Sequence, residues 1–376
     1  NIREHALVSL SEFISSDLKE YSSKRNYDYG PNNRKNTSNL SKFITHGILS
    51  EKEIITQSLE KFNYEVIEKF IQEILWRIYW KGWLELRPNV WNDYLLELKK
   101  VREEFNDNKE YLNAIEGNTN IVCFNEWIKE LKEYNYLHNH TRMWFASIWI
   151  FTLNLPWQLG AEFFIKHLLD GDAASNTLGW RWVAGIQTHG KHYLASEWNI
   201  KKFSNNRFNE IKLNENALPK ISRNTYSAVI KDFNNPKKIE DKNLIIFENN
   251  ISFELTDFKN QKFKKIYLIS NKNENREIKL SEKIINFKTG LIEDQKNQLK
   301  EKSINCEIID ISEIKKIENC YYLYPCVGEN LDYLNSQGMN SLEFLYRNLD
   351  RNFWKYCDKG FFNFKKYIPK IIKEIF

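Results

Sequence analysis

The sequence lacks the long apolar run that a membrane-spanning helix requires. Such a helix needs about 18 consecutive apolar residues or more, whereas the most apolar stretch, Met143 to Leu155, is shorter and contains Thr152 and Asn154. We therefore predict a buried helix there and no membrane association. The sequence also lacks the apolar core of a secretory signal and begins at Asn1 without methionine, which we interpret as a processed or incomplete start.

Paired cysteines and metal-binding motifs are missing as well. The five cysteines are odd in number and include neither a C-x-x-C pair nor zinc-site spacing. We therefore expect a protein of the reducing cytosol without a bound metal. His138 and His140 are the pair that most resembles metal ligands, but they are only two positions apart and no third ligand is near them in the sequence.

Strong charge is absent, whereas tryptophan is abundant. The net charge of +5 and the pI near 8.6 are compatible with a nucleic-acid partner but do not identify one. Eleven of the twelve tryptophans lie before residue 199. Since a chain of 376 residues exceeds the usual size of one core, this asymmetry predicts two unlike domains.

Residues 1–205 show the periodicity of an all-helical domain. Apolar residues recur at helical spacing in segments that we expect to be helices, at 5–22, 51–81, 92–104, 123–135, 139–153 and 158–182. Short breaks such as Arg87-Pro88-Asn89 separate them. A polar connector at 206–240 follows.

Residues 241–376 predict a small α/β domain. Apolar runs typical of buried strands occur at 243–248, 265–270, 306–311 and 320–324, and a helical pattern occurs at 281–302. Strands interleaved with helices favour a parallel, Rossmann-like sheet, and no G-x-G-x-x-G or P-loop motif is present there. The expected fold class is therefore mainly α, with an all-helical domain followed by an α/β domain of unknown role.

Residues 170–182 combine two carboxylates, an amide and two indoles. Asp170 and Asp172 suit the cationic or hydroxyl-bearing parts of a cofactor, and Asn176 suits a ring nitrogen. Trp180 and Trp182 suit stacking or electron transfer, so the stretch resembles a flavin redox site. The alternative is an amphipathic helix whose tryptophans fill a core, and these residues alone leave both interpretations open.

Three further motifs carry polar groups suited to a ligand. Glu73, Trp76 and Arg77 share one face of an expected helix, which is compatible with a planar ligand or with a surface ion pair beside core tryptophans. The stretches 37–41 and 138–143 precede apolar helices, where hydroxyls and backbone N–H groups meet anions. Each stretch is also typical of an ordinary helix cap.

Together these residues resemble the FAD-binding domain of the DNA photolyase and cryptochrome family. The blocks occur in the family's order and at nearly its spacings: Tyr21, Thr37 to Ser41 with Gly47 to Ser50, Glu73 to Arg77, Asn139 to Met143, and Asp170 to Asp172 with Asn176, Trp180 and Trp182. The resemblance covers roughly residues 5–205 and leaves the later α/β part outside it.

The resemblance implies that the helical domain binds FAD in a folded, U-shaped conformation. The residues implied for its diphosphate and ribityl region are Tyr21, Thr37, Ser38, Leu40, Ser41 and Arg77. The rest of the implied FAD site comprises Asn139, Arg142, Asp170, Asp172 and Asn176. Arg142 is expected to pair with Asp170, and Asn176 is expected to lie opposite flavin N5.

The resemblance further implies light-driven repair of UV-damaged DNA. In photolyases, reduced FAD excited by blue light donates an electron to a pyrimidine dimer, the ring bonds open, and the electron returns. The implied contacts to the flipped lesion are Glu73, Trp76, His140, Met143 and Trp182. The alternative activity is that of a cryptochrome-like blue-light receptor that keeps FAD and signals through a partner.

Two positions bear on which dimer is repaired. His140 stands where enzymes that repair cyclobutane dimers usually have arginine, and it matches the proton-donating histidine of enzymes that repair 6-4 photoproducts. Met143 is the cyclobutane-type residue. We favour cyclobutane dimers, with 6-4 photoproducts as the alternative.

The implied electron-transfer chain also departs from the family pattern. Trp180 and Trp157 match its first two tryptophans, but the third position falls near Phe105, which is harder to oxidise. Either Trp91 or Tyr111 completes the route, or photoreduction of the flavin is weak.

The last departures concern charge and domain order. Asn39 replaces the family's usual basic residue, and the family's N-terminal antenna domain is expected to be absent because Asn1 lies close to the start of the helical domain. The α/β part would then be a rearranged antenna domain, a remnant of one, or an unrelated cap. The basic residues that we expect to contact DNA phosphates are Arg25, Arg34, Lys35, Arg181, Lys191, Lys201 and Lys202. We expect a cytoplasmic monomer.

Overall fold

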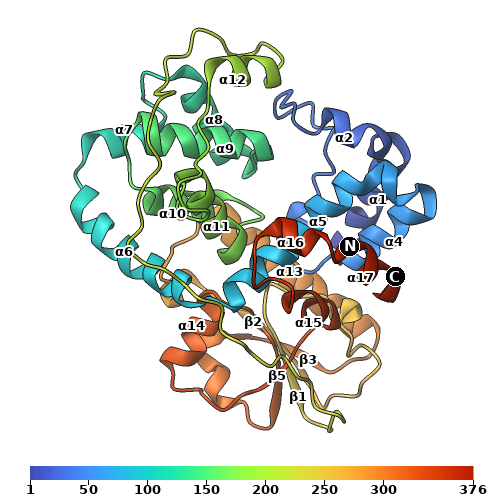
Figure 1. Cartoon of the computed structure of the whole chain (residues 1–376). Helices are drawn as coiled ribbons and strands as arrows, with labels where there is room; N and C mark the ends of the chain where they lie inside the picture. Colours follow the sequence, from blue (N-terminus) through green and yellow to red (C-terminus); the bar gives the residue numbers. More distant parts are fainter. Residues whose placement is uncertain (376) are drawn as a thin grey trace. The chain divides into compact units, whose positions relative to one another are not determined.

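The chain forms two compact units in the computed structural model, which describes residues 1–375 (Figure 1). Unit 1 comprises residues 1–19, 40–88 and 227 onward, and unit 2 comprises residues 20–39 and 89–226. Within the described chain, no helix is both long enough and apolar enough to cross a membrane.

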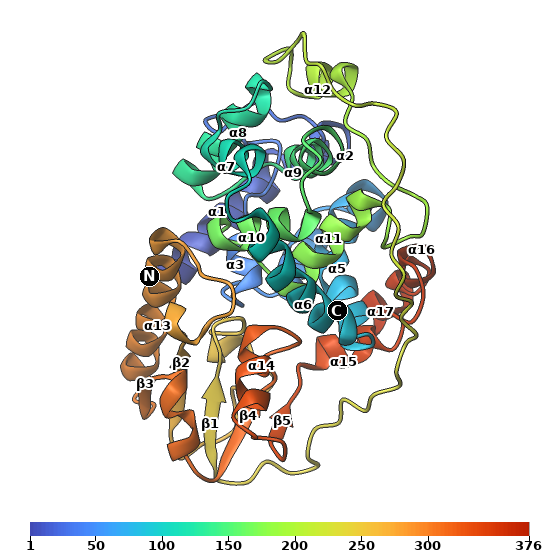
Figure 2. The ribbon, with the colours of Figure 1, turned by 90° about the vertical axis from the view of Figure 1, so that its left-hand side faces the viewer.

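Unit 1 contains a parallel five-stranded sheet with the strand order β3-β2-β1-β4-β5 (Figure 2). Its strands are β1 (Asn243–Ile246), β2 (Ile266–Ser270), β3 (Cys306–Asp310), β4 (Cys320–Leu323) and β5 (Glu343–Leu345). In the central register, Leu244 lies opposite Ile266 on one side and Tyr321 on the other. The predicted parallel α/β fold is confirmed, and β5 is an additional strand.

The neighbouring strands β1 and β4 are largely apolar because both faces of the sheet are buried there. Ile245 and Phe247 pack on one face with Leu334 of α14 (Glu329–Ser336) and residues of the 3-10 helix η5 (Ile311–Lys316). Successive side chains of a strand point to opposite faces, so Leu244 and Ile246, which are also fully buried, face the other side. Helix α13 (Glu282–Glu301), predicted at 281–302, packs against β2 and β3.

The remaining helices of unit 1 come from both ends of the chain. They are α1 (Ile2–Ser16), α3 (Ser41–Thr45), α4 (Glu51–Lys61), α5 (Tyr64–Glu85), α15 (Asn348–Trp354), α16 (Phe361–Lys365) and α17 (Ile368–Ile375). The expected single helix at 51–81 is in fact α4 followed by α5. Helix α5 packs closely against α15, because a Cβ atom on Gly82 would lie 2.5 Å from Trp354 and 2.6 Å from the Cys357 sulfur.

Two buried carboxylates link the early helices of unit 1 to its later part. Glu85 accepts hydrogen bonds from the Tyr324 hydroxyl and the Val327 backbone N–H, both at 2.7 Å. Glu51 pairs with Arg347 at 3.1 Å. Burial raises the pKa of Glu85. Burial would also raise the pKa of Glu51, but Arg347 overcomes this effect and holds that pKa below its usual value.

Unit 2 is helical. Its helices are α2 (Tyr21–Lys24), α6 (Asn89–Phe105), α7 (Lys109–Glu116), α8 (Val122–Tyr134), α9 (Asn139–Ser147), α10 (Trp157–His167), α11 (Ala173–Ala184) and α12 (Glu197–Phe203). A π-helical turn, η2 (Ile148–Thr152), continues α9. The expectation of one helix at 158–182 is wrong: the chain turns between α10 and α11, where the Asp172 carboxylate accepts a hydrogen bond from the Ser175 N–H at 2.8 Å and caps α11.

The two units also divide the chain differently from the boundary expected near residue 205. Residues 1–19 and 40–88 cluster with the sheet, not with the other helices. That residues 1–205 and 241–376 fold as separate domains, joined by a connector at 206–240, stays a prediction.

Two glycines provide a matched test of this packing. Gly82→Ala should lower the free energy of unfolding by about 1–3 kcal/mol, because the new methyl group overpacks a filled contact. Gly290→Ala should raise it by about 0.5–1 kcal/mol, since Gly290 lies inside α13 with nothing within 4 Å of the new methyl group. Urea denaturation measures both values. Equal effects of the two changes would contradict the close contact at Gly82.

Candidate functional site

The expected site residues are divided between the two units. Unit 1 contains Leu40, Ser41, Glu73, Trp76 and Arg77, and unit 2 contains the others. Each unit therefore carries its own group of candidate side chains.

In unit 1, one ion-dipole contact brings the short helix α3 to the long helix α5. The Arg77 guanidinium donates a hydrogen bond to the Thr45 hydroxyl at 2.5 Å. Thr45 ends α3, which begins at Ser41 with Leu40 as its N-cap residue. This contact links the Arg77 side chain to the helix that begins at Ser41.

Trp76 lies in an aromatic cluster on α5. Its indole stacks on the Phe361 ring with centroids 3.5 Å apart and planes 9° apart. Tyr79 and Trp80 contact the same indole at 5.4 and 5.1 Å. Phe361 is a residue of this site that the sequence did not reveal, because it lies far along the chain in α16.

In unit 2, the expected partners Arg142 and Asp170 form a bidentate ion pair with contacts of 3.0 and 2.8 Å. The Asp170 carboxylate is buried, and the Arg142 Nε also donates to the Leu137 carbonyl at 2.8 Å. Burial would lower the pKa of Arg142, but Asp170 outweighs it and raises that pKa. The pair fixes the turn before α11 to α9.

Helix α11 places Asn176 and Trp180 against α10. The Asn176 amide nitrogen donates to the Ala161 carbonyl at 2.8 Å, which orients the amide. The Trp180 ring packs over Gly160, where a Cβ atom would lie only 2.2 Å from the indole. The indole nitrogen of Trp180 is buried, and no acceptor for it lies among the described residues.

The loop at 25–40 is held by asparagine side chains. Asn36 donates to the backbone carbonyls of Lys24 and Tyr27 at 2.9 and 2.8 Å, so the loop is tied to the end of α2, which begins at Tyr21. Asn39 has a φ of 54° and donates to the Arg34 carbonyl at 2.9 Å. Asparagine tolerates this left-handed conformation better than most residues, which gives Asn39 a structural role next to the half-buried Thr37 and Ser38.

Two histidines lie at the start of α9, beside the exposed Asn139. His138 is the N-cap residue: its Nδ1 accepts a hydrogen bond from the His140 N–H at 3.1 Å, and burial lowers its pKa to about 4. The His140 Nδ1 lies 2.9 Å from the Asn26 carbonyl. Because a carbonyl only accepts, the His140 Nδ1 carries the proton. Burial lowers the pKa of His140 too.

Tyr193 connects two of the expected lesion contacts. Its ring stacks on Trp182 with centroids 5.9 Å apart, and its hydroxyl lies 3.4 Å from the His140 Nε2. Met143 is half-buried one helical turn beyond His140. Sequence patterns did not reveal Tyr193, because it lies in a loop without helical or strand periodicity.

An aromatic series extends from Trp157. Trp157 stacks on Tyr94 with centroids 5.3 Å apart, and Tyr94 contacts Trp91 at 5.5 Å. Tyr111 contacts Trp149 instead, at 6.0 Å. Trp91 and Tyr111 are the two residues considered for extending the series. Trp157 reaches Trp91 through Tyr94.

Two of the basic residues expected to contact DNA instead make contacts within unit 2. Arg34 forms an ion pair with the buried Glu130, and Arg181 is buried with its guanidinium 5.6 Å from the Tyr226 ring. The expectation is wrong for these two residues. Lys35, Lys191, Lys201 and Lys202 are exposed.

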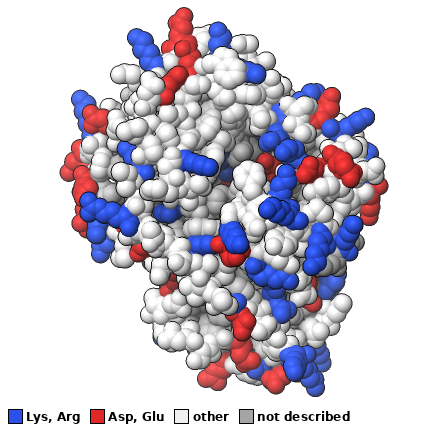
Figure 3. Space-filling model, viewed as in Figure 1, with Lys and Arg blue, Asp and Glu red and all other residues white. Residues whose placement is uncertain are grey.

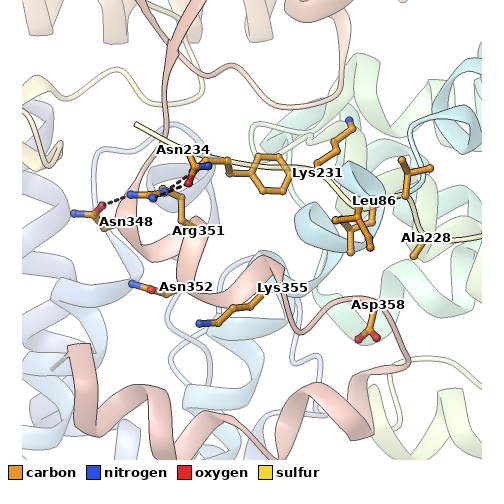
Figure 4. Close-up of a pocket in the computed structure, with 12 residues that line it drawn as sticks. Leu86, Ala228, Lys231, Asn234, Asn348, Arg351, Asn352, Lys355 and Asp358 are labelled. Carbon is orange, nitrogen blue, oxygen red and sulfur yellow. Dashed lines mark hydrogen bonds between the residues drawn. The ribbon is translucent and has the colours of Figure 1, made fainter. Parts of the chain in front are cut away.

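A pocket of about 510 Å³ lies elsewhere in unit 1, between the stretch 228–234 and α15 (Figure 4). It contains none of the expected site residues. The Arg351 guanidinium in its wall donates to Asn348 at 3.4 Å and Asn234 at 3.5 Å. Among the described residues, no three His, Cys, Asp or Glu side chains are placed to hold a metal.

Comparisons with known proteins identify the family of the chain. The family model for the FAD binding domain of DNA photolyase matches residues 70–266, which is just over half of the chain. The chain belongs to this family.

The curated relatives are photolyases that are longer than the matched region. The chain is 30% identical to the deoxyribodipyrimidine photo-lyase of Buchnera aphidicola over 183 residues, 47% of this chain and 38% of that protein. It is 26% identical to the corresponding protein of Vibrio cholerae over 196 residues, 51% of this chain and 41% of that protein. The matches therefore span only about two fifths of these relatives.

Among solved structures, a bacterial class III photolyase from Agrobacterium tumefaciens is 27% identical, with a TM-score of 0.46. That match covers 54% of this chain and 42% of the solved one.

The His138 cap predicts a pH dependence of stability. The unfolded chain binds a proton on this histidine near pH 6.5, whereas the folded chain binds it only near pH 4. The free energy of unfolding should therefore fall by about 2–3 kcal/mol as the pH drops through that interval. His138→Asn should remove most of this loss, since asparagine also caps helices.

Urea denaturation at pH 7.5 and pH 5 measures the effect. His189→Asn is the matched control, because His189 is exposed. An unchanged pH dependence in the His138 variant would show that His138 does not cause the loss of stability at low pH.

Proposed function

We propose that this chain binds FAD and uses blue light to repair UV-induced pyrimidine dimers in DNA, with cyclobutane dimers as its substrate. The observation that carries the proposal is the family match over residues 70–266, combined with lesion-contacting residue types at Glu73, Trp76, Met143 and Trp182. A protein that only sensed light would not need these four side chains.

The side chains of both units fit FAD by their chemistry. The Asn176 amide is held through its nitrogen, so its oxygen can accept a hydrogen bond from a flavin N–H. The buried indole N–H of Trp180 has no protein acceptor among the described residues, which is a penalty that an acceptor-rich ligand relieves. Tyr21, Thr37, Ser38, Ser41 and Arg77 offer hydroxyls and a cation suited to the diphosphate.

The reaction divides between the cofactor and the chain. Reduced FAD supplies the electron that opens the dimer when light excites it. In the chain, the Glu73 carboxylate accepts hydrogen bonds from the flipped pyrimidines, Trp76 and Trp182 stack on their faces, and Met143 packs beneath them. The Arg142–Asp170 pair and the Asp172 cap hold α11, and with it Asn176, in one orientation.

The state of His140 supports cyclobutane dimers over 6-4 photoproducts. A proton donor must carry an available proton, but the proton on the His140 Nδ1 is engaged by the Asn26 carbonyl. Burial also lowers the pKa of this histidine, which disfavours the doubly protonated ring. His140 then acts as a neutral wall residue next to Tyr193.

Flavin binding and dimer repair provide the primary test. Purified protein should show flavin absorption and, after reduction, should reverse cyclobutane dimers in an oligonucleotide under blue light. Glu73→Ala should keep the flavin but lower repair about tenfold or more, because it removes a hydrogen bond to a charged group. Glu65→Ala, an exposed position on the same helix, should leave both properties unchanged.

Each failure has a distinct meaning. Bound flavin without repair of either dimer type would favour the light-receptor activity. Absence of flavin after reconstitution would overturn both activities, and loss of flavin from the Glu73 variant would show that Glu73 belongs to the cofactor site.

The aromatic series beginning at Trp157 predicts how the flavin is photoreduced. Tyr94→Phe and Trp157→Phe should both slow blue-light reduction of the oxidised flavin, because each removes an oxidisable ring from the stacked pair. Tyr111→Phe should slow it less, since Tyr111 reaches Trp180 only through edge contacts with Trp149. Absorption under constant light, with an external reductant, measures the rates. Equal rates in the Tyr94 and Tyr111 variants would contradict the route.

A further inference from the structure

One segment late in the chain is rich in lysine. Residues 355–373, which follow α15, contain six lysines and one aspartate. The net charge of this segment is +5. This C-terminal segment also lies outside the family match at residues 70–266.

The lysines of the C-terminal segment are on the surface. Lys355, Lys359, Lys366, Lys370 and Lys373 are exposed, and Lys365 lies 3.5 Å from Glu68 of α5. Figure 3 shows Lys and Arg side chains gathered where Figure 1 places α15, α16 and α17. Such a cluster attracts a polyanion, and DNA is the polyanion that the proposed function brings to this protein.

An exposed aromatic ring accompanies these charges. Phe362 is 85% exposed, so its ring is accessible to a ligand. Its neighbours Phe361 and Phe364 are buried and anchor α16 on Tyr79 of α5. Phe362 therefore points outward from a fixed helix, and Lys366 follows it by one helical turn.

The buried neighbour Phe361 supports a residue of the proposed lesion site. It stacks on Trp76, just as Tyr193 stacks on Trp182 in unit 2. Both tryptophans proposed to contact the lesion thus have a second aromatic ring behind them. The Tyr79 hydroxyl also donates to the Lys359 carbonyl at 2.9 Å, which joins the C-terminal segment to α5 next to Trp76.

We propose that residues 355–373 are a DNA-contacting surface. Its exposed lysines bind backbone phosphates, Phe362 stacks on an unpaired base beside the flipped dimer, and Phe361 positions Trp76. The inference rests on the proposed function for the identity of the lesion. Stacking on bases is sequence-tolerant, and phosphate contacts are sensitive to salt.

Binding in the dark tests the surface without requiring photochemistry. Fluorescence anisotropy should be recorded with a dimer-containing oligonucleotide and with the same oligonucleotide undamaged. Lys359→Gln combined with Lys366→Gln should reduce the slope of log affinity against log salt by about 2, because each lysine neutralises one phosphate. Lys99→Gln with Lys100→Gln, on the exposed side of α6, is the matched control.

The two phenylalanines should respond differently. Phe362→Ala should weaken binding of the damaged oligonucleotide about tenfold, with an unchanged melting temperature since the ring is exposed. Phe361→Leu keeps most of the side-chain volume but loses the stacking ring. It should therefore weaken binding of damaged DNA more than binding of undamaged DNA. Val122→Ala, at another exposed apolar position, should change neither affinity.

The outcomes separate this inference from the proposed function. Unchanged affinity in the Phe362 variant and an unchanged salt slope in the double-lysine variant would overturn the proposal that this surface contacts DNA. Tighter binding by the Phe361 variant would also overturn it, because the C-terminal segment would then be a cover over Trp76. Failure of the wild-type protein to bind flavin would overturn the proposed function, whereas a reduced salt slope on undamaged DNA would still support the surface.

Discussion

The contact between α5 and α15 at Gly82 is the constraint on which unit 1 depends. A glycine at this position lets Trp354 and Cys357 lie directly against the helix backbone. The chain then continues into α16, whose Phe361 stacks on Trp76 and completes the aromatic cluster. Because α5 also carries Glu73 and Arg77, one close backbone approach sets the orientation of the helix that bears three of the candidate residues.

Buried polar groups reinforce the same association. Glu85 at the end of α5 takes two hydrogen bonds from the loop after β4, and Glu51 on α4 is paired with Arg347 just before α15. Burying a carboxylate is unfavourable unless its partners are in place. These groups therefore favour one arrangement of the early helices on the sheet, whereas apolar contacts alone tolerate several.

The sequence predicted the elements with strong local patterns and missed those fixed by distant residues. Four strands were recognised because each contains an apolar run, which in β1 and β4 reflects burial on both faces of the sheet. The strand β5 has only three residues, and one of them is exposed, so it left no such run. The break between α10 and α11 was missed because the apolar spacing continues across it, although Asp172 is a good capping residue. The Arg142–Asp170 pair was expected from family resemblance, whereas Tyr193 and Phe361 belong to the site through tertiary contacts that no local pattern encodes.

The division of the chain into units also has a consequence for how the protein is made. Unit 2 contains no residue after 226, so it can be completed early during synthesis, whereas residues 1–19 and 40–88 must wait for the later part of unit 1. Such non-local pairing is slow, and it leaves apolar surface exposed on the nascent chain. Helix α5 leaves the ribosome with Trp76 uncovered and with an open gap at Gly82, and both are filled only when residues 354–361 emerge. Chaperone capture during this interval would fall on the helix that later carries the candidate site.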